Sequence, residues 1–321
     1  MINEFVLNFN RNNSHSTSIC NMKKTYLIAF FLIFWHSISY GQDNAETGIA
    51  DSLLGWKTGG LISINFSQAS FSNWAAGGEN NIGINGFYKP FLNFRSQNWI
   101  WENTLDLRYG KVKTGSVPWK KSDDLIDFDS KIGLQASKKW YYSLLLDFTS
   151  QFDEGVNPEN NNAVVSKFMA PGYLGFALGM DFKPNDKMSL FLSPATARTT
   201  FVLDDNLSNQ GAYGVTPGEK SWTQYGPSAV FKFKDEVIEN VVIDTKASLL
   251  YEYASDASIV FNWDLIIGMK INNFLTATIT TGLIYDQNVL FNIFDDAGNV
   301  IDTENRWQFK EVLAIGVAFK Y

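Results

Sequence analysis

The sequence has very little of the two residue types that most often build metal sites and nucleophilic catalytic sites. Its 321 residues include one cysteine, Cys20, and two histidines, His15 and His36. All three precede Gln42, where we expect the mature chain to begin. The mature protein would then have no disulfide framework, no cysteine or histidine metal site, and no Ser-His or Cys-His nucleophile.

Long apolar runs and basic clusters are also missing. The mean hydropathy of −0.12 is too polar for a bundle of membrane-spanning helices, and the net charge of −7 argues against a nucleic-acid partner. An apolar run from Tyr26 to Trp35 is too short to span a bilayer as a helix. It follows Met22-Lys23-Lys24 and precedes Ser39-Tyr40-Gly41, which places small residues where signal peptidase requires them and predicts a signal peptide over 22–41. Residues 1–21 would be an upstream extension or a misassigned start.

The last stretch, 307–321, shows the pattern that recurs through the chain. Alternate residues form a nearly unbroken apolar row, interrupted only by Glu311, while the residues between them are small or polar with one exception. A period of two indicates a strand whose faces meet different media. The length and contrast are typical of a membrane-barrel strand, with one row in lipid and the other in the lumen. The aromatic residues Phe319 and Tyr321 at the end resemble the assembly signal of outer-membrane barrels.

The same alternation predicts twelve strands, although those at 188–203 and 223–233 are poorly defined. Short links alternate with long, Asp-, Asn- and Gly-rich links, the long ones falling near 114–126, 153–171, 204–222 and 287–305. Barrels of the outer membrane sort their turns and loops in this way. We therefore expect an all-β fold: a transmembrane antiparallel up-and-down β-barrel of about 12 strands over residues 59–321, preceded by a periplasmic lead-in at 42–58. The expected location is the cell outer membrane.

The inward rows carry charges of both signs. A circular barrel of twelve strands would have a backbone diameter of roughly 24 Å. Opposite charges inside it should pair and partly fill the lumen, which favours a narrow or gated channel with a weak preference for cations. The candidate lumen-lining residues are Glu102, Asp106, Arg108, Asp129, Lys131, Asp147, Asp181, Asp244, Lys246, Glu252, Asp264 and Lys310.

Several short motifs resemble an uncharacterised family of outer-membrane proteins from Bacteroidetes, a domain of unknown function. The most specific is Asn73-Trp74-Ala75-Ala76-Gly77-Gly78-Glu79-Asn80, and weaker ones are Ser193-Pro194-Ala195-Thr196, Gly211-Ala212-Tyr213-Gly214-Val215 and Ile284-Tyr285-Asp286. The resemblance runs from about Trp56 to Tyr321. It implies an outer-membrane barrel and brings no activity and no site residues.

Other functions remain open. A structural or docking barrel that binds a protein or envelope partner is the main alternative to a channel, and an outer-membrane enzyme is a third possibility without a visible catalytic set. Acidic clusters at Asp123, Asp124 and Asp127, and at 295–304, are expected to be solvated loops rather than calcium sites, because neither has EF-hand spacing. We expect no cofactor. The expected partners are outer-membrane lipid and the barrel assembly machinery, and the sequence names no substrate.

Overall fold

The computed structural model describes residues 54–72, 79–157, 163–253, 258–272, 274–294 and 300–320. The expected upstream extension, signal peptide and most of the lead-in lie outside these residues, as do Asn73–Gly78 of the most specific motif and Tyr321. No helix among the described residues is long and apolar enough to cross a membrane.

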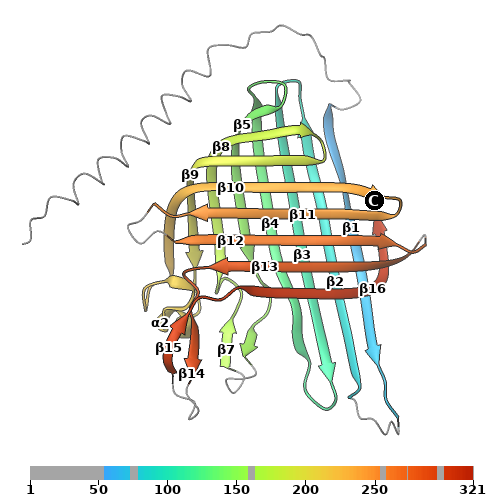
Figure 1. Ribbon diagram of the computed structural model, residues 1–321, viewed down its shortest axis with the longest axis vertical. Helices are drawn as coiled ribbons and strands as arrows, with labels where there is room; N and C mark the ends of the chain where they lie inside the picture. The colour runs from blue at the N-terminus through green and yellow to red at the C-terminus, as the bar shows by residue number, and fades with distance from the viewer. Residues whose placement is uncertain are drawn as a thin grey trace, which may run out of the picture. The chain divides into compact units, whose positions relative to one another are not determined.

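Twelve antiparallel strands close into one barrel in the order β1-β16-β13-β12-β11-β10-β9-β8-β5-β4-β3-β2 (Figure 1). Each barrel strand pairs with its neighbours in the chain except where a small separate hairpin intervenes, between β5 and β8 and between β13 and β16, so the topology is up-and-down as expected. In Figure 1 the strands β10 to β13 run across β1 to β4 behind them, as strongly tilted strands on two walls of a barrel do. The strands are β1 (Gly55–Ala69), β2 (Asn81–Arg95), β3 (Trp99–Thr114), β4 (Lys120–Gln135), β5 (Trp140–Ser150), β8 (Gly172–Asn185), β9 (Met188–Phe201), β10 (Ser221–Ile238), β11 (Val241–Tyr251), β12 (Ile259–Lys270), β13 (Leu275–Asp286) and β16 (Gln308–Lys320).

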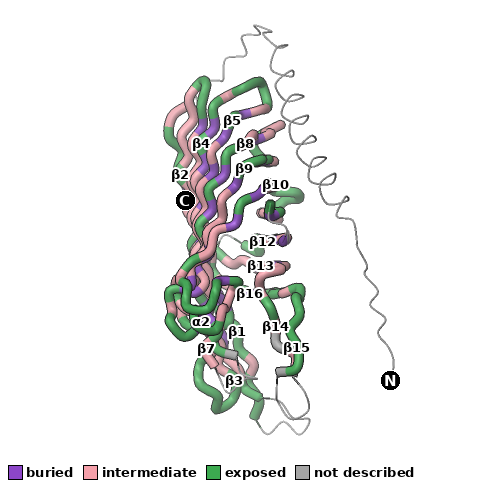
Figure 2. The backbone as a smooth tube through the Cα atoms, turned by 90° about the vertical axis from the view of Figure 1, so that its left-hand side faces the viewer, coloured by how far each residue is buried: buried purple, intermediate pink, exposed green. Residues whose placement is uncertain are grey.

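The outward rows are apolar, and the expected alternation is confirmed in β16. Leu313 and Ile315 are 65% and 53% exposed, whereas Ala314 between them is 9% exposed. Because each barrel strand has one row outside, exposed apolar side chains surround the barrel, and buried residues alternate with them along the strands (Figure 2). Members of this belt include Ile62, Ile64, Ile84, Tyr88, Ile132, Leu134, Phe176, Leu178, Leu192, Leu249 and Phe319.

Aromatic clusters mark both ends of the belt. At the end with the short turns, called here the turn end, Trp56, Phe94 and Trp101 form one cluster, with ring centroids 5.1 Å and 5.8 Å from Trp56. At the other end, the loop end, Trp307 packs against Tyr285 with centroids 4.8 Å apart. Aromatic girdles at both interfaces are typical of membrane barrels.

The three longest described connections lie at the loop end and contain small elements of their own. Two are hairpins, β6 (Gly155–Asn157) with β7 (Ala163–Ser166) and β14 (Phe291–Phe294) with β15 (Val300–Glu304). The β9–β10 loop contains α2 (Asp205–Asn209) and η3 (Ala212–Gly214). It is held by its own small apolar core, made by Ala170, Val202, Leu207 and Val215.

Asp204 fixes the start of this loop. Its carboxylate caps α2 by accepting from the backbone N–H groups of Asn206 and Leu207, and it pairs with Lys167 at 2.8 Å. The hydrogen bond from Lys167, followed by the backbone N–H of Leu207, lowers the pKa of Asp204. The loop is therefore tied to the β7–β8 connection through an ionised carboxylate.

Two expected links are shorter than predicted because strands replace them. Residues 120–126, expected in a long loop, form the first part of β4, where Lys121 and Asp124 pair with each other at 2.9 Å. Likewise β10 continues to Ile238, and the turn to β11 closes at Asn240, which adopts a positive φ of 65°. Charged residues in these strand ends resemble loop residues in composition, which explains both errors.

Candidate functional site: the charged lumen

Ion pairs join opposite walls of the barrel. Lys89 on β2 lies 2.9 Å from Asp244 on β11, and Lys246 on β11 lies 2.9 Å from Asp129 on β4. Four strands separate β2 from β11, and also β11 from β4, along the shorter way round the barrel. Asp129 also accepts from Lys232 on β10 at 2.7 Å. These contacts cross the lumen.

The cross-lumen pairs show that the barrel is flattened at this level. A circular cross-section would separate opposite walls by roughly 24 Å, which is beyond the combined reach of a lysine and an aspartate. Walls that are joined by direct side-chain contacts lie closer to the ~10 Å of face-to-face packed sheets. Side chains therefore occupy the lumen at this level.

A second group of charges lies between β3, β12, β16 and β4. Arg108 on β3 forms a two-pronged pair with Asp106, with nitrogen–oxygen distances of 3.0 Å and 2.7 Å. The same guanidinium reaches Asp264 on β12 at 3.7 Å. Lys310 on β16 lies 2.7 Å from Asp123 on β4. The side chains of Asp264 and Lys310 are each 43% exposed, so solvent reaches this side of the layer.

A third group lies nearer the turn end, and its central pair is shielded from solvent. Lys131 on β4 binds Asp181 on β8 at 2.5 Å, and the Asp181 side chain is fully buried. Ser189 donates to Asp181 and accepts from Lys131, which completes a closed set of contacts. Glu102 pairs with Lys183 and lies 3.6 Å from Lys131. An inward apolar cluster covers this end of the lumen; it consists of Leu145, Ala177 and Phe191, with Val230 packed against them.

At the loop end, a hydrogen-bonded network spans strands β9 to β13. Arg198 donates to Gln224 at 3.0 Å and lies 3.4 Å from Asp286. Gln224 is fully buried and donates to Glu252 and Ser258. This network joins the ends of β9 and β10 to the β11–β12 connection and to the end of β13.

The sequence placed these side chains on the inner face but did not pair them. Among the twelve candidates, eleven form the ion pairs or hydrogen bonds given above. The twelfth, Asp147, lies directly opposite Asp129 on the neighbouring strand and forms no salt bridge with another described residue. Of the proposed assembly signal, Phe319 points outward and is 59% exposed. The role of these residues in conduction or assembly stays a prediction.

Several residues of these ion pairs and hydrogen bonds were not predicted from the sequence. Lys89 lies beside Pro90, which obscured the alternation of β2, and Arg198 lies in β9, where the register shifts at Ser193–Thr196. This bulge switches the inward row from Ser189 and Phe191 to Thr196 and Arg198, so no single alternation describes the strand. Asp123, Asp124 and Asp127, considered as a calcium cluster, instead pair with Lys310, Lys121 and Lys246, respectively. No group of potential metal ligands is found among the described residues.

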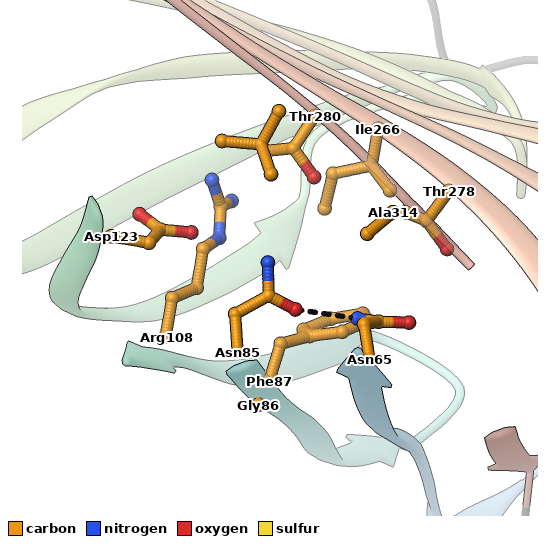
Figure 3. A pocket seen from close by; sticks show the side chains of 11 residues that line it. Asn65, Asn85, Gly86, Phe87, Arg108, Asp123, Ile266, Thr278, Thr280 and Ala314 are labelled. Carbon is orange, nitrogen blue, oxygen red and sulfur yellow. Dashed lines mark hydrogen bonds between the residues drawn. The ribbon is translucent and has the colours of Figure 1, made fainter. Parts of the chain in front are cut away.

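The empty space inside the barrel is small near the ion pairs and larger beside them. A cavity of about 20 Å³ is lined by residues of seven strands. Figure 3 shows Asn65 and Asn85 joined by a hydrogen bond of 2.8 Å, with Arg108 beside them. A Cβ added at Gly268 would meet nothing within 4 Å, and at Gly282 its nearest neighbours would be 4.0 Å away. Open space therefore lies along the β12–β13 wall.

A family model matches part of the chain, and several solved structures are distantly similar to it. Residues 66–156 match the family described as "Protein of unknown function (DUF3078)". This match confirms the resemblance to an uncharacterised family, and its description names no activity. No curated protein matches the chain.

The solved structures are distant. The translocator domain of the autotransporter NalP from Neisseria meningitidis is 12% identical, with a TM-score of 0.32, over 93% of this chain and 98% of that one. An outer membrane channel from Pseudomonas putida F1 is 8% identical, with a TM-score of 0.38, over 88% and 100%. OmpT of Vibrio cholerae is 6% identical, with a TM-score of 0.33, over 83% and 99%. These similarities concern the fold alone.

The geometry of the barrel shows in which membrane it lies. A closed antiparallel barrel with an even number of strands, an outward apolar belt, aromatic residues at both ends of that belt and a polar interior is the architecture of outer-membrane proteins. The chain is an outer-membrane β-barrel.

Proposed function

We propose that the barrel is a narrow, gated channel for small solutes, closed in this structure by the cross-lumen ion pairs. The observation that carries the proposal is the contact of Lys246 with Asp129 and Asp127 on the opposite wall. Replacing buried ion pairs by packed apolar side chains is often neutral or stabilising. A barrel that served only as an anchor would gain little from such a charged layer. In a channel, the same charged layer forms a barrier that water and ions can open.

The partial exposure of this layer supports the same proposal. Asp264 and Lys310 are solvated on one side, and the lumen is open around Gly268 and Gly282. Rearrangement of a few side chains would connect these spaces. Eight of the twelve candidate lumen residues are carboxylates and four are cations, which favours weak cation selectivity.

Single-channel recording with refolded protein in planar bilayers tests the proposal. Wild type should give rare, small openings, and Arg108→Gln should raise conductance because it removes the link between Asp106 and Asp264. Lys187→Gln is the matched control, since Lys187 pairs with Asp235 at a turn and is 58% exposed. Large, steady, unselective steps from wild type would refute the closed lumen. Silence of both wild type and Arg108→Gln would refute the channel.

A docking role is the second candidate, favoured by exposed apolar side chains at the loop end. Phe168 and Ile301 are 57% and 63% exposed, and Val165 on the β6–β7 hairpin is 41% exposed. A contiguous apolar patch formed by such side chains would mark a protein contact. If the barrel is a docking protein, the double variant Phe168→Ser, Ile301→Ser should no longer cross-link to its envelope partner. The wild type and the variant should both lack conductance. We propose no enzymatic activity.

We also propose that secretion removes residues 1–41, so that the mature chain begins at Gln42, and that Phe319 and Tyr321 direct assembly. Mass spectrometry of the N-terminal peptide from membranes should find Gln42 first. A peptide that retains Met22 would contradict this processing site.

A further inference from the structure

The seam that closes the barrel is paired over only part of its length. Strand β1 pairs with β16 from Leu61 opposite Lys320 to Phe66 opposite Ile315. Beyond that point β16 continues to Gln308 and stays paired with β13 on its other side. The edge formed by residues 308–314 has no partner strand within the described residues.

An unpaired edge is incompatible with contact to hydrocarbon alone. Alternate residues of a strand direct their N–H and C=O groups to each side, and each unsatisfied group in lipid costs several kcal/mol. Such backbone is tolerated in a membrane where it borders a water-filled cavity. Water must therefore reach the edge of β16 at this seam.

A charged side chain on the same edge gives independent support. Glu311 faces outward between Phe309 and Leu313, which are 64% and 65% exposed. It lies opposite Thr281 on β13, the one polar neighbour on that face of the strand pair. Three residues lie between it and Trp307 in the loop-end girdle, so it lies inside the apolar belt rather than above it. A carboxylate at this depth needs water nearby.

The cavity of about 20 Å³ lies directly behind the seam. Val312 and Ala314 of the unpaired edge form part of its wall, and Asn65 belongs to the last paired part of β1. Its volume admits a water molecule, and its polar groups can bind one. Figure 3 shows that amide and hydroxyl groups share this space with apolar side chains; the uncharged lining includes Asn65, Asn85, Thr278, Thr280, Phe87 and Ile266.

We propose that the β1–β16 seam above Phe66 and Ile315 is a lateral portal between the lumen and the bilayer. The portal takes small amphipathic solutes, with an apolar body that enters lipid and a hydrogen-bonding group that the amides and hydroxyls bind. This inference rests on the proposed channel function and names its solute class. The solute enters along the lumen and leaves sideways through the seam, so it need not cross the whole barrel.

A reversible bridge across the seam tests the portal. Ser67 is the next inward residue of β1 after Asn65, and Ala314 is its counterpart on β16. The full chain with Cys20→Ser, Ser67→Cys and Ala314→Cys is produced in Gram-negative cells and treated with a short bis-methanethiosulfonate. The readout is influx of phenylnaphthylamine, an aromatic amine that fluoresces in the membrane. The matched control is Ser63→Cys with Ala318→Cys, a pair that already lies directly opposite across the paired part of the seam.

Wild type should speed influx over cells without the protein. Bridging Ser67→Cys to Ala314→Cys should abolish that increase, a thiol reductant should restore it, and the bridged control should behave as wild type. Unchanged influx after verified bridging would overturn the portal, even if planar bilayers show the proposed conductance. Absence of both conductance and influx in wild type would instead remove the channel itself. A photo-crosslinker at position 311 should capture lipid; capture of a partner's peptide strand would overturn the portal in favour of an interface.

Discussion

Removing Lys246 should unlock the ion-paired layer at a measurable cost in stability. The Lys246 Nζ lies 2.9 Å from Asp129 and 3.1 Å from Asp127. Lys246→Met keeps the apolar length of the side chain and removes the charge. Asp129 keeps Lys232 as a partner, whereas Asp127 keeps, among the residues that the structure describes, the hydroxyl of Thr149 at 3.0 Å.

The expected loss can be bounded from burial. Breaking a fully buried pair costs about 3–5 kcal/mol, and an exposed pair contributes about 0–1 kcal/mol. The side chains of Lys246 and Asp127 are 25% and 20% exposed, so screening by solvent reduces the buried value. We expect Lys246→Met to lower the free energy of unfolding by about 2–3 kcal/mol.

A double-mutant cycle separates the lost pair from other effects. Asp127→Asn in the Lys246→Met background removes the stranded charge, so the double variant should recover about 1–2 kcal/mol relative to additivity. Urea unfolding in detergent micelles, followed by tryptophan fluorescence and by heat-dependent gel migration, measures each free energy. The exposed pair Lys187 and Asp235 provides the control cycle, with a coupling below about 1 kcal/mol.

Additive losses at Lys246 and Asp127 would refute the cross-lumen pair. A stable Lys246→Met variant with wild-type conductance would also show that the layer does not close the lumen. The same variant should open more often than wild type in planar bilayers, because water enters where the ammonium group was held between two carboxylates.

Three further outcomes follow from positions elsewhere in the barrel. Gly226→Ala should impair assembly, because its Cβ would overlap the backbone carbonyl of Tyr251, whereas Gly268→Ala should assemble normally. Heat-dependent gel migration measures the yield of assembled barrel for both variants. Equal yields would contradict the close approach of Gly226 to Tyr251. Ile315→Arg should lose about 2–4 kcal/mol of stability on the lipid face, while Gly268→Arg, in open lumen, should be tolerated; equal loss at both sites would show the faces to be misassigned. The lowered pKa of Asp204 stabilises its loop above the unfolded pKa of about 3.9 and loses that effect as pH falls through the folded pKa. The hydrogen-exchange protection factors of the β9–β10 loop, corrected for the intrinsic pH dependence of exchange, should therefore fall below about pH 4. Asp204→Asn should remove this dependence; an unchanged pH profile in the variant would contradict the assignment.

The barrel could be predicted because lipid and lumen impose opposite requirements on neighbouring residues. In β16 this contrast is direct, since Leu313 and Ile315 would be costly inside and Lys310 would be costly outside. In β9 the bulge at Ser193–Thr196 breaks the period, so alternation predicted only a poorly defined strand there. The ends of β4 and β10 were misread because charged strand residues beyond the apolar belt have the composition of loops.

The pairing inside the lumen could not be predicted in the same way. Alternation assigns Lys89 and Asp244 to the inner face, yet their contact depends on which walls approach when the barrel flattens. That approach is set by the whole closed sheet, including inward apolar residues such as Phe191 that the sequence offered no reason to place inside. The sequence therefore predicts which charged residues lie on the inner face, and only the folded structure shows which of them pair.

The distribution of burial across these charges determines where the lumen can open. Lys131 and Asp181 are buried beside the apolar cluster around Phe191. Separating them would leave two unpaired charges without water, which has a high free-energy cost. Lys310 and Asp264 are already solvated on one side, so their partners can be exchanged for water at little cost. Opening should therefore begin on the wall formed by β12, β13 and β16. This wall borders the unpaired part of the seam, and the same movement that parts the ion pairs would widen the cavity behind Ala314.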